Sequence, residues 1–122
     1  MMQKDFTVSE THSKIGLEVF FKITDLWGLT AQEQRILLGD PALSTFHEWR
    51  NGDGPIVPQD TLERISFVLG IFKALRTLYP TEERACAWPK KPNRYFGGQS
   101  ALDVMLSGRL KDVRQYLDAQ CQ

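Results

Sequence analysis

Residues 60–79, D-T-L-E-R-I-S-F-V-L-G-I-F-K-A-L-R-T-L-Y, are the stretch of the chain that decides its fold. Their apolar side chains recur at helical spacing in two neighbouring stripes, formed by Leu62, Ile65, Leu69, Phe72 and Leu75 and by Val68, Ile71 and Leu78. Pro80 ends the helix because proline has no amide proton to donate. A helix that is apolar around so much of its girth belongs at the centre of a core or at a dimer interface.

Helical periodicity continues on both sides of this segment, and no stretch alternates apolar and polar residues as a strand does. Six further helices are expected over residues 9–27, 30–38, 44–50, 81–88, 100–108 and 110–120. Thr30 with Glu33, and Ser100 with Asp103, have the spacing of capping boxes, which satisfy the first free amides of a helix. The sequence therefore predicts an all-α protein of about seven helices.

The first expected helix, residues 9–27, carries two apolar stripes. One consists of Ile15, Val19, Ile23 and Leu26, and the other of Leu17, Phe20 and Phe21. This helix lies largely outside the motifs described below. Its role in the core, in dimerisation or as an arm therefore stays open.

The composition is that of an ordinary globular domain, with 42% hydrophobic and 25% charged residues in a chain of 122. No apolar run approaches the roughly 20 residues needed to cross a bilayer, and residues 1–6 show no secretory signal, so we expect a cytoplasmic protein. The net charge of zero hides an asymmetry. Residues 1–57 carry five basic and eight acidic side chains, whereas residues 58–122 carry ten basic and seven acidic ones.

Two short predicted helices, residues 30–38 and 44–50, are joined by a glycine-containing turn in the layout of a DNA-binding helix-turn-helix. The side chains that would meet base edges or phosphates are Arg35 on the first helix and Ser44, Thr45, His47, Glu48, Arg50 and Asn51 on or after the second. Consecutive short helices are also common in small all-α proteins. The acidic balance of this half opposes the phosphate contacts that supply much of DNA affinity. From these residues alone, the DNA-binding interpretation stays open.

A rigid, aromatic and basic loop follows at residues 88–98, W-P-K-K-P-N-R-Y-F-G-G. Its prolines restrict the backbone, so ordering the loop on a partner costs less entropy. It contains the aromatic side chains favoured at interface hot spots together with basic ones, in the order Trp88, Lys90, Lys91, Arg94, Tyr95 and Phe96. Trp88 and Phe96 are equally suited to the core, where they would pin the loop to the long helix. Basic and aromatic residues together can also bind single-stranded nucleic acid.

The sequence shows no arrangement of residues typical of an enzyme. His12 and His47 are the only histidines, and no metal-binding or Ser/His/Asp motif is present. Cys86 and Cys121 lack the paired spacing of a zinc site, and Cys86 has no histidine nearby in the sequence to activate it. We expect free thiols and a protein without catalytic activity, metal or cofactor.

The carboxyl-terminal motifs resemble a known family. The sequence A-x-x-W-P-K-K-P-N-R-Y-F-G-G-Q-S-A-L-D-V-M-L-S-G-R at residues 85–109, followed by V-R-x-Y-L-D-A at residues 113–119, resembles the toxin-binding domain of the Xre/MbcA/ParS group of bacterial antitoxins. Upstream, L-T-A-Q-E-Q-R-I-L-L-G-D at residues 29–40 and F-H-E-W-R-N-G at residues 46–52 resemble the Xre-like helix-turn-helix that precedes this domain.

The resemblance implies a type II antitoxin that binds and neutralises a cognate RES-domain toxin, from an enzyme class that consumes NAD or uses it for ADP-ribosylation. It also implies repression of the antitoxin's own operon. Residues 1–79 would form the helix-turn-helix DNA-binding region with the long central helix, and residues 80–122 the small helical toxin-binding domain. The implied partners are the toxin, operator DNA and a second copy of the chain in a homodimer.

Carried over by position, the resemblance implies functional residues in both regions. It implies toxin contacts by Trp88, Asn93, Arg94, Tyr95 and Phe96, with Lys90, Lys91 and Arg114 beside them, and DNA contacts by Ser44, Thr45, His47 and Arg50. Asn93 is also suited to cap the loop, so we expect it to contact the toxin less than Tyr95 or Arg94. Two other hypotheses remain: a stand-alone helix-turn-helix regulator without a toxin, and an interaction module that does not bind DNA.

Overall fold

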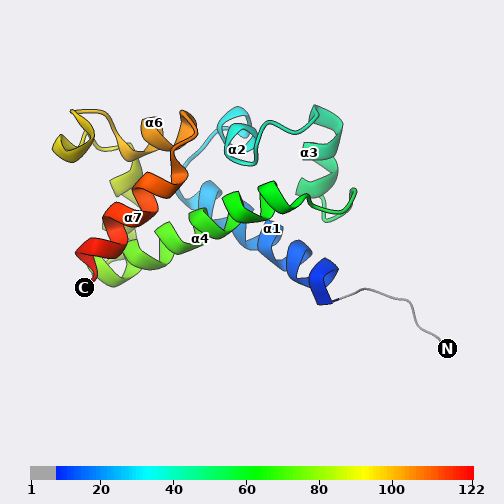
Figure 1. Cartoon of the computed structure of the whole chain (residues 1–122), viewed down its shortest axis with the longest axis horizontal. Coiled ribbons are helices and arrows are strands. Elements are labelled where there is room, and N and C mark those ends of the chain that lie inside the picture. Colours follow the sequence, from blue (N-terminus) through cyan, green and yellow to red (C-terminus); the bar gives the residue numbers. More distant parts are fainter. Residues whose placement is uncertain (1–7) are drawn as a thin grey trace.

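The structure, a computed structural model, describes residues 8–122 and their side chains from His12 onward. Residues 1–6, where the sequence shows no secretory signal, lie outside the described residues. Within this range the chain forms seven α-helices and two short 3₁₀ helices (Figure 1): α1 (Val8–Leu26), α2 (Ala31–Leu37), α3 (Leu43–Arg50), α4 (Gln59–Leu78), α5 (Glu82–Ala87), η1 (Trp88–Lys90), η2 (Arg94–Phe96), α6 (Ala101–Leu106) and α7 (Leu110–Gln120). No strand forms among the described residues, so the predicted all-α class is confirmed.

Helix α4 is the element around which the other helices pack. It contacts α1 from the amino-terminal half of the chain and α7 from the carboxyl-terminal half (Figure 1). The side chains of Val68, Ile71 and Leu75 have no exposed surface at all. The two apolar stripes of residues 60–79 therefore place this helix at the centre of the core within a single chain.

Helix α1 buries mainly one of its two apolar stripes. Leu17, Phe20 and Phe21 are buried, whereas Ile15 keeps 52% and Leu26 47% of its surface exposed. The bulky rings decide this orientation, because Phe21 packs edge-on against Phe46 of α3 with ring centroids 5.7 Å apart. The ends of the other stripe face away from the core.

A buried amide joins the first two helices. Gln34 of α2 is buried, and its Nε2 donates hydrogen bonds to Thr24 Oγ1 at 2.9 Å and to Asp25 Oδ1 at 2.8 Å. The Thr24 hydroxyl in turn donates to the Phe20 carbonyl oxygen at 2.9 Å. Both donor groups are satisfied, as buried polar groups require. This network fixes the end of α1 against α2.

We expect Leu17→Ala and Ile15→Ala to have very different effects although the residues are two positions apart. Removing the buried Leu17 side chain should lower the free energy of unfolding by about 2–5 kcal/mol. Removing the exposed Ile15 side chain should change it by no more than about 0.5 kcal/mol. Urea denaturation followed by circular dichroism measures both values, and equal losses would contradict the orientation of α1.

Candidate functional site

Four aromatic rings meet where η1, η2 and α7 come together. Tyr116 lies among them: Trp88 stacks on its ring at a centroid distance of 6.4 Å, Tyr95 lies at 4.3 Å, and Phe96 meets it edge-on at 5.4 Å. We call these four residues the aromatic cluster. Tyr95 is 67% exposed, whereas Trp88, Phe96 and Tyr116 are half-buried. The cluster therefore holds one large aromatic side chain at the surface in a fixed position.

Asn93 organises the loop from within. Its Oδ1 accepts a hydrogen bond from the Tyr95 amide at 2.8 Å, and its carbonyl oxygen accepts from the amides of Phe96 and Gly98, each at 3.0 Å. Its own amide donates to the Gln99 carbonyl oxygen at 2.9 Å. Asn93 therefore caps η2, the role that the sequence offered as an alternative to toxin contact.

Two of the predicted toxin-binding cations make contacts across the fold. Lys90 Nζ donates a hydrogen bond to the Gly28 carbonyl oxygen at 2.9 Å, at the carboxyl end of α1, where a positive charge is favourable. The Arg114 guanidinium lies against Gly70 of α4 and pairs with Asp118 at 3.0 Å. Both side chains hold helices together, which limits their freedom to reach a partner.

Lys91 and Arg94 differ from these two residues. Both are exposed, and neither side chain has an ion pair or hydrogen bond with any described residue. Residues 84–102 contain four basic residues and no acidic one. Around Tyr95, this segment therefore combines an exposed ring with unpaired positive charge.

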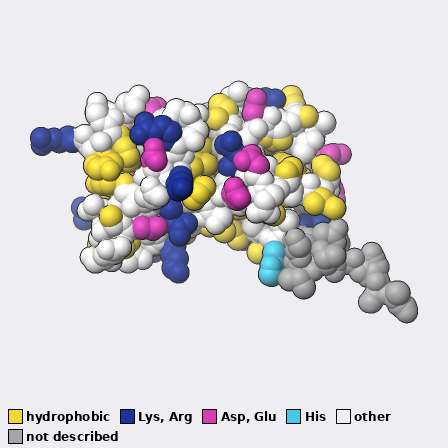
Figure 2. Space-filling view, viewed as in Figure 1, with side chains coloured by type: hydrophobic (Ala, Val, Ile, Leu, Met, Phe, Trp, Pro, Cys, Tyr) yellow, Lys and Arg dark blue, Asp and Glu magenta, His cyan; other side chains and the backbone are white. Residues whose placement is uncertain are grey.

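An open groove of about 550 Å³ runs between η2 and α7 beside the aromatic cluster. Three cluster rings line it, and α7 with the residue before it completes the lining with Arg109, Asp112, Gln115, Ala119 and Gln120. Figure 2 shows apolar side chains gathered at this end of the molecule with basic side chains around them. An apolar centre with a charged rim is the usual anatomy of a protein-binding surface.

Helix α3 displays part of its predicted DNA-reading face. Ser44, His47, Glu48 and Asn51 are exposed and Thr45 is half-buried, while Phe46 and Trp49 are buried as the spacing predicted. Trp49 Nε1 donates to the Pro55 carbonyl oxygen at 2.9 Å, which fixes the turn after the helix. The helix therefore offers hydroxyl, imidazole, carboxylate and amide groups to solvent.

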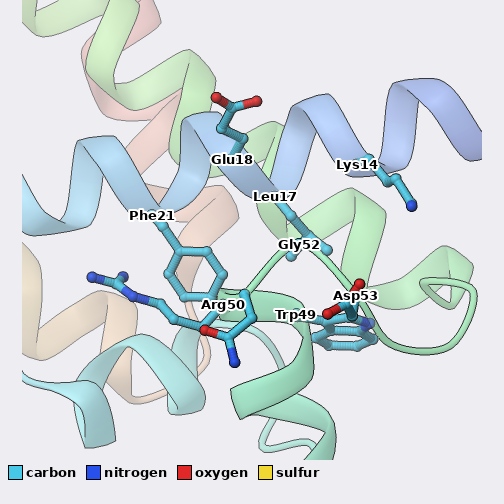
Figure 3. Close-up of a pocket in the computed structure, with 9 residues that line it drawn as sticks. Lys14, Leu17, Glu18, Phe21, Trp49, Arg50, Gly52 and Asp53 are labelled. Carbon is cyan, nitrogen blue, oxygen red and sulfur yellow. The ribbon is translucent and has the colours of Figure 1, made fainter.

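The two arginines predicted to contact DNA are bound within the protein. Arg50 Nη2 lies 2.8 Å from Asp25 Oδ2, and its guanidinium carbon lies 4.7 Å from the centre of the Phe21 ring. Arg35 Nε donates to the Pro41 carbonyl oxygen at 2.7 Å. In Figure 3, Arg50 extends along the face of Phe21 at one side of a shallow cavity of about 400 Å³ between α1 and the end of α3.

Among the described residues, the pKa values of the Asp25 carboxyl and the Cys86 thiol are shifted. Burial by itself would raise the pKa of the Asp25 carboxyl, but hydrogen bonds from Arg50 and Gln34, with the Arg50 charge, outweigh it and hold the pKa below its ordinary value. Burial raises the pKa of the Cys86 thiol, and the nearby Glu82 carboxylate adds to the rise. The Cys86 thiol therefore stays protonated at neutral pH, which is its unreactive form.

Within residues 8–122, no group of three or more His, Cys, Asp or Glu side chains is placed to hold a metal ion. None of the described helices is both long and apolar enough to span a bilayer.

Comparison with known proteins assigns the carboxyl-terminal region. The family described as the antitoxin Xre/MbcA/ParS C-terminal toxin-binding domain matches residues 74–120, from the end of α4 to the end of α7. The uncharacterized protein y4oB of Sinorhizobium fredii (strain NBRC 101917 / NGR234) is 54% identical over 107 residues, which cover 85% of this chain and 82% of that protein. No solved structure matches the chain.

The chain belongs to the Xre/MbcA/ParS antitoxin family, as its motifs indicated. It is therefore an antitoxin of a toxin–antitoxin system, with a toxin as its protein partner. The matched region contains the whole aromatic cluster and the loop. Helices α1, α2 and α3 lie outside it.

Sequence reasoning did not single out two residues that the structure brings into these surfaces. Tyr116 contacts every other ring of the aromatic cluster, and its only signal was its place in the motif V-R-x-Y-L-D-A. Asp25 binds Arg50, which lies 25 positions away. No local pattern marks a pair at that separation.

The lowered pKa of Asp25 predicts a pH-dependent contribution to stability. A carboxyl whose pKa is lowered by folding stabilises the protein above its unfolded pKa of about 3.9, and this contribution is lost as the pH falls through the folded pKa. We expect Asp25→Asn to lower the free energy of unfolding at neutral pH by no more than about 1 kcal/mol, because the pair is exposed. At a pH below the lowered folded pKa, where the wild-type carboxyl is protonated, the difference should vanish. Urea unfolding at both pH values measures it, and an equal loss at both would show that the charge is not responsible.

Proposed function

We propose that this antitoxin captures and neutralises a RES-domain toxin, which consumes NAD or uses it for ADP-ribosylation, through residues 80–122. The observation that carries the proposal is the exposed Tyr95 ring, flanked by the unpaired Arg94 and Lys91, inside the region that matches the toxin-binding domain. The same proposal assigns residues 1–79 to operator DNA and to repression of the antitoxin's own operon.

The geometry of the loop favours tight protein binding. Tyr95 is held by Tyr116 and Phe96 and by the hydrogen bond from its amide to Asn93, so little side-chain freedom remains to be lost on binding. Rigid aromatic residues with a neighbouring arginine are typical of interface hot spots. Lys91 and Arg94 add positive charge that would attract an acidic surface around the toxin's contact site.

The support for DNA binding is the pair of helices α2 and α3 and the exposed polar face of α3. Residues 1–57 carry three more acidic than basic side chains, eight against five, which weakens the phosphate attraction of one chain. We therefore propose a homodimer that presents two α3 helices, within a larger complex in which the toxin acts as co-repressor. Two linked sites of low affinity then bind one operator more tightly than either alone.

We expect the double variant Arg94→Ala/Tyr95→Ala to lose about 10²-fold or more in affinity for the toxin encoded beside this gene, because hot-spot truncations cost about 2 kcal/mol or more each. The fold should survive, since both side chains are exposed. Isothermal titration calorimetry with purified toxin measures the affinity, and growth on co-expression measures neutralisation.

A matched control is Lys22→Ala/Ile56→Ala, which removes one exposed basic and one exposed apolar side chain outside the matched region. It should bind toxin as the wild type does. Unchanged affinity in the Arg94/Tyr95 variant would place the interface elsewhere. A neighbouring gene product that is harmless and does not co-purify would contradict the RES-toxin assignment.

We expect His47→Ala/Asn51→Ala to weaken binding to the operon's own promoter by about tenfold or more, through lost base or phosphate contacts. Fluorescence anisotropy with promoter DNA, with and without toxin, measures this, and Ser66→Ala at an exposed position of α4 outside both surfaces is the control. If the wild type does not bind the promoter at low salt, with or without toxin, the repressor function is contradicted. The protein would then be a toxin-binding protein only.

A further inference from the structure

We propose that Asp25 restrains DNA binding by holding Arg50 against α1, so that a DNA phosphate must displace this carboxylate to reach the guanidinium. The inference rests on the proposed binding of operator DNA by α3. It adds that Asp25, which lies on α1 outside the α2–α3 pair, lowers the affinity for DNA. We call Asp25 and Arg50 the latch.

Arg50 is the only lysine or arginine in α3, so the positive charge of this helix depends on it. In the latch its Nη2 lies 2.8 Å from Asp25 Oδ2, and its guanidinium lies 4.7 Å from the centre of the Phe21 ring. Figure 3 shows the side chain running past the Phe21 ring, with its guanidinium directed away from Trp49 and Asp53. With Arg50 paired to Asp25, α3 keeps the carboxylate of Glu48, which has no ion pair among the described residues.

Asp25 is held in place from its other side. Gln34 Nε2 donates to Asp25 Oδ1 at 2.8 Å and to Thr24 Oγ1 at 2.9 Å, and Gln34 is itself buried. The carboxylate therefore keeps one oxygen on the buried amide and presents the other to Arg50. A DNA phosphate must compete with this preorganised acceptor for the guanidinium.

The latch is accessible to a competing anion. The side chains of Arg50 and Asp25 are 38% and 51% exposed. An exposed ion pair of this kind contributes little to stability, so it can open at small cost. A phosphate at this position would gain Arg50 but would meet the negative charge of Asp25 next to it. Asp25 therefore opposes DNA binding both by occupying Arg50 and by repelling the backbone.

The variant Asp25→Asn tests this, because it removes the charge while keeping an oxygen that can accept from Gln34. We measure the affinity for promoter DNA by fluorescence anisotropy, with the full-length protein and the toxin complex, from about 50 to about 200 mM salt. The expected result is about 5- to 20-fold tighter binding at low salt. The slope of log K against log salt should become steeper by about one per bound chain, since one more cation meets a phosphate.

Two further variants separate the latch from a general charge effect. Glu82→Gln removes the same charge from an exposed pair with Arg76, outside the proposed DNA-binding face, and should change the affinity less than about twofold. Asp25→Asn/Arg50→Ala should lose the whole gain, because the released guanidinium is absent. If Asp25→Asn proves unfolded by circular dichroism, Asp25→Ser replaces it in the same series.

Weaker or unchanged binding by Asp25→Asn would overturn the inference, and weaker binding would mean that the carboxylate positions Arg50 for DNA. A gain that persists in the double variant would also overturn it. If neither the wild type nor Asp25→Asn binds the promoter with or without toxin, the proposed DNA-binding function fails together with the latch. Loss of the latch effect alone leaves that function intact.

Discussion

The burial of α4 on more than one side is the constraint on which the rest of the structure depends. Val68, Ile71 and Leu75 have no exposed surface because α1 and α7, from opposite halves of the chain, both pack against this helix. The region that matches the toxin-binding domain begins inside it, at residue 74. The proposed DNA-binding and toxin-binding regions therefore share one core, and a defect in α4 would damage both surfaces at once.

Much of the fold could be predicted because its signals are local. The two apolar stripes of residues 60–79 predicted a central helix, and both predicted capping boxes form, at Thr30 with Glu33 and at Ser100 with Asp103. Helix α1 shows where local signals stop. Its two stripes are both apolar, and the choice between them depends on Phe21 meeting Phe46, a contact between helices that periodicity does not contain.

The sequence predicted which types of residue form the two proposed surfaces, but not which atoms these residues contact. Lys90, Arg50 and Arg114 were all expected to face a partner, yet each binds a carbonyl oxygen or carboxylate in a distant part of the chain. Long basic side chains reach several ångströms from the backbone, so their partners are set by the tertiary arrangement rather than by neighbours in the sequence. Tyr95 kept its predicted exposure because the loop that carries it is fixed locally by Asn93.

The contact between Lys90 and Gly28 links the end of α1 to the loop, so this end lies between the two proposed recognition surfaces. Asp25 and Gly28 are three residues apart; one holds α3 through Arg50 and the other holds the loop through Lys90. We expect a displacement of this short segment at one surface to alter the anchoring of the other surface. If toxin binding changes operator affinity by this route, thermodynamic reciprocity requires the operator to change toxin affinity by the same factor. The last turn of α1 belongs to neither recognition surface. It would then set how strongly toxin binding and operator binding affect each other's affinity.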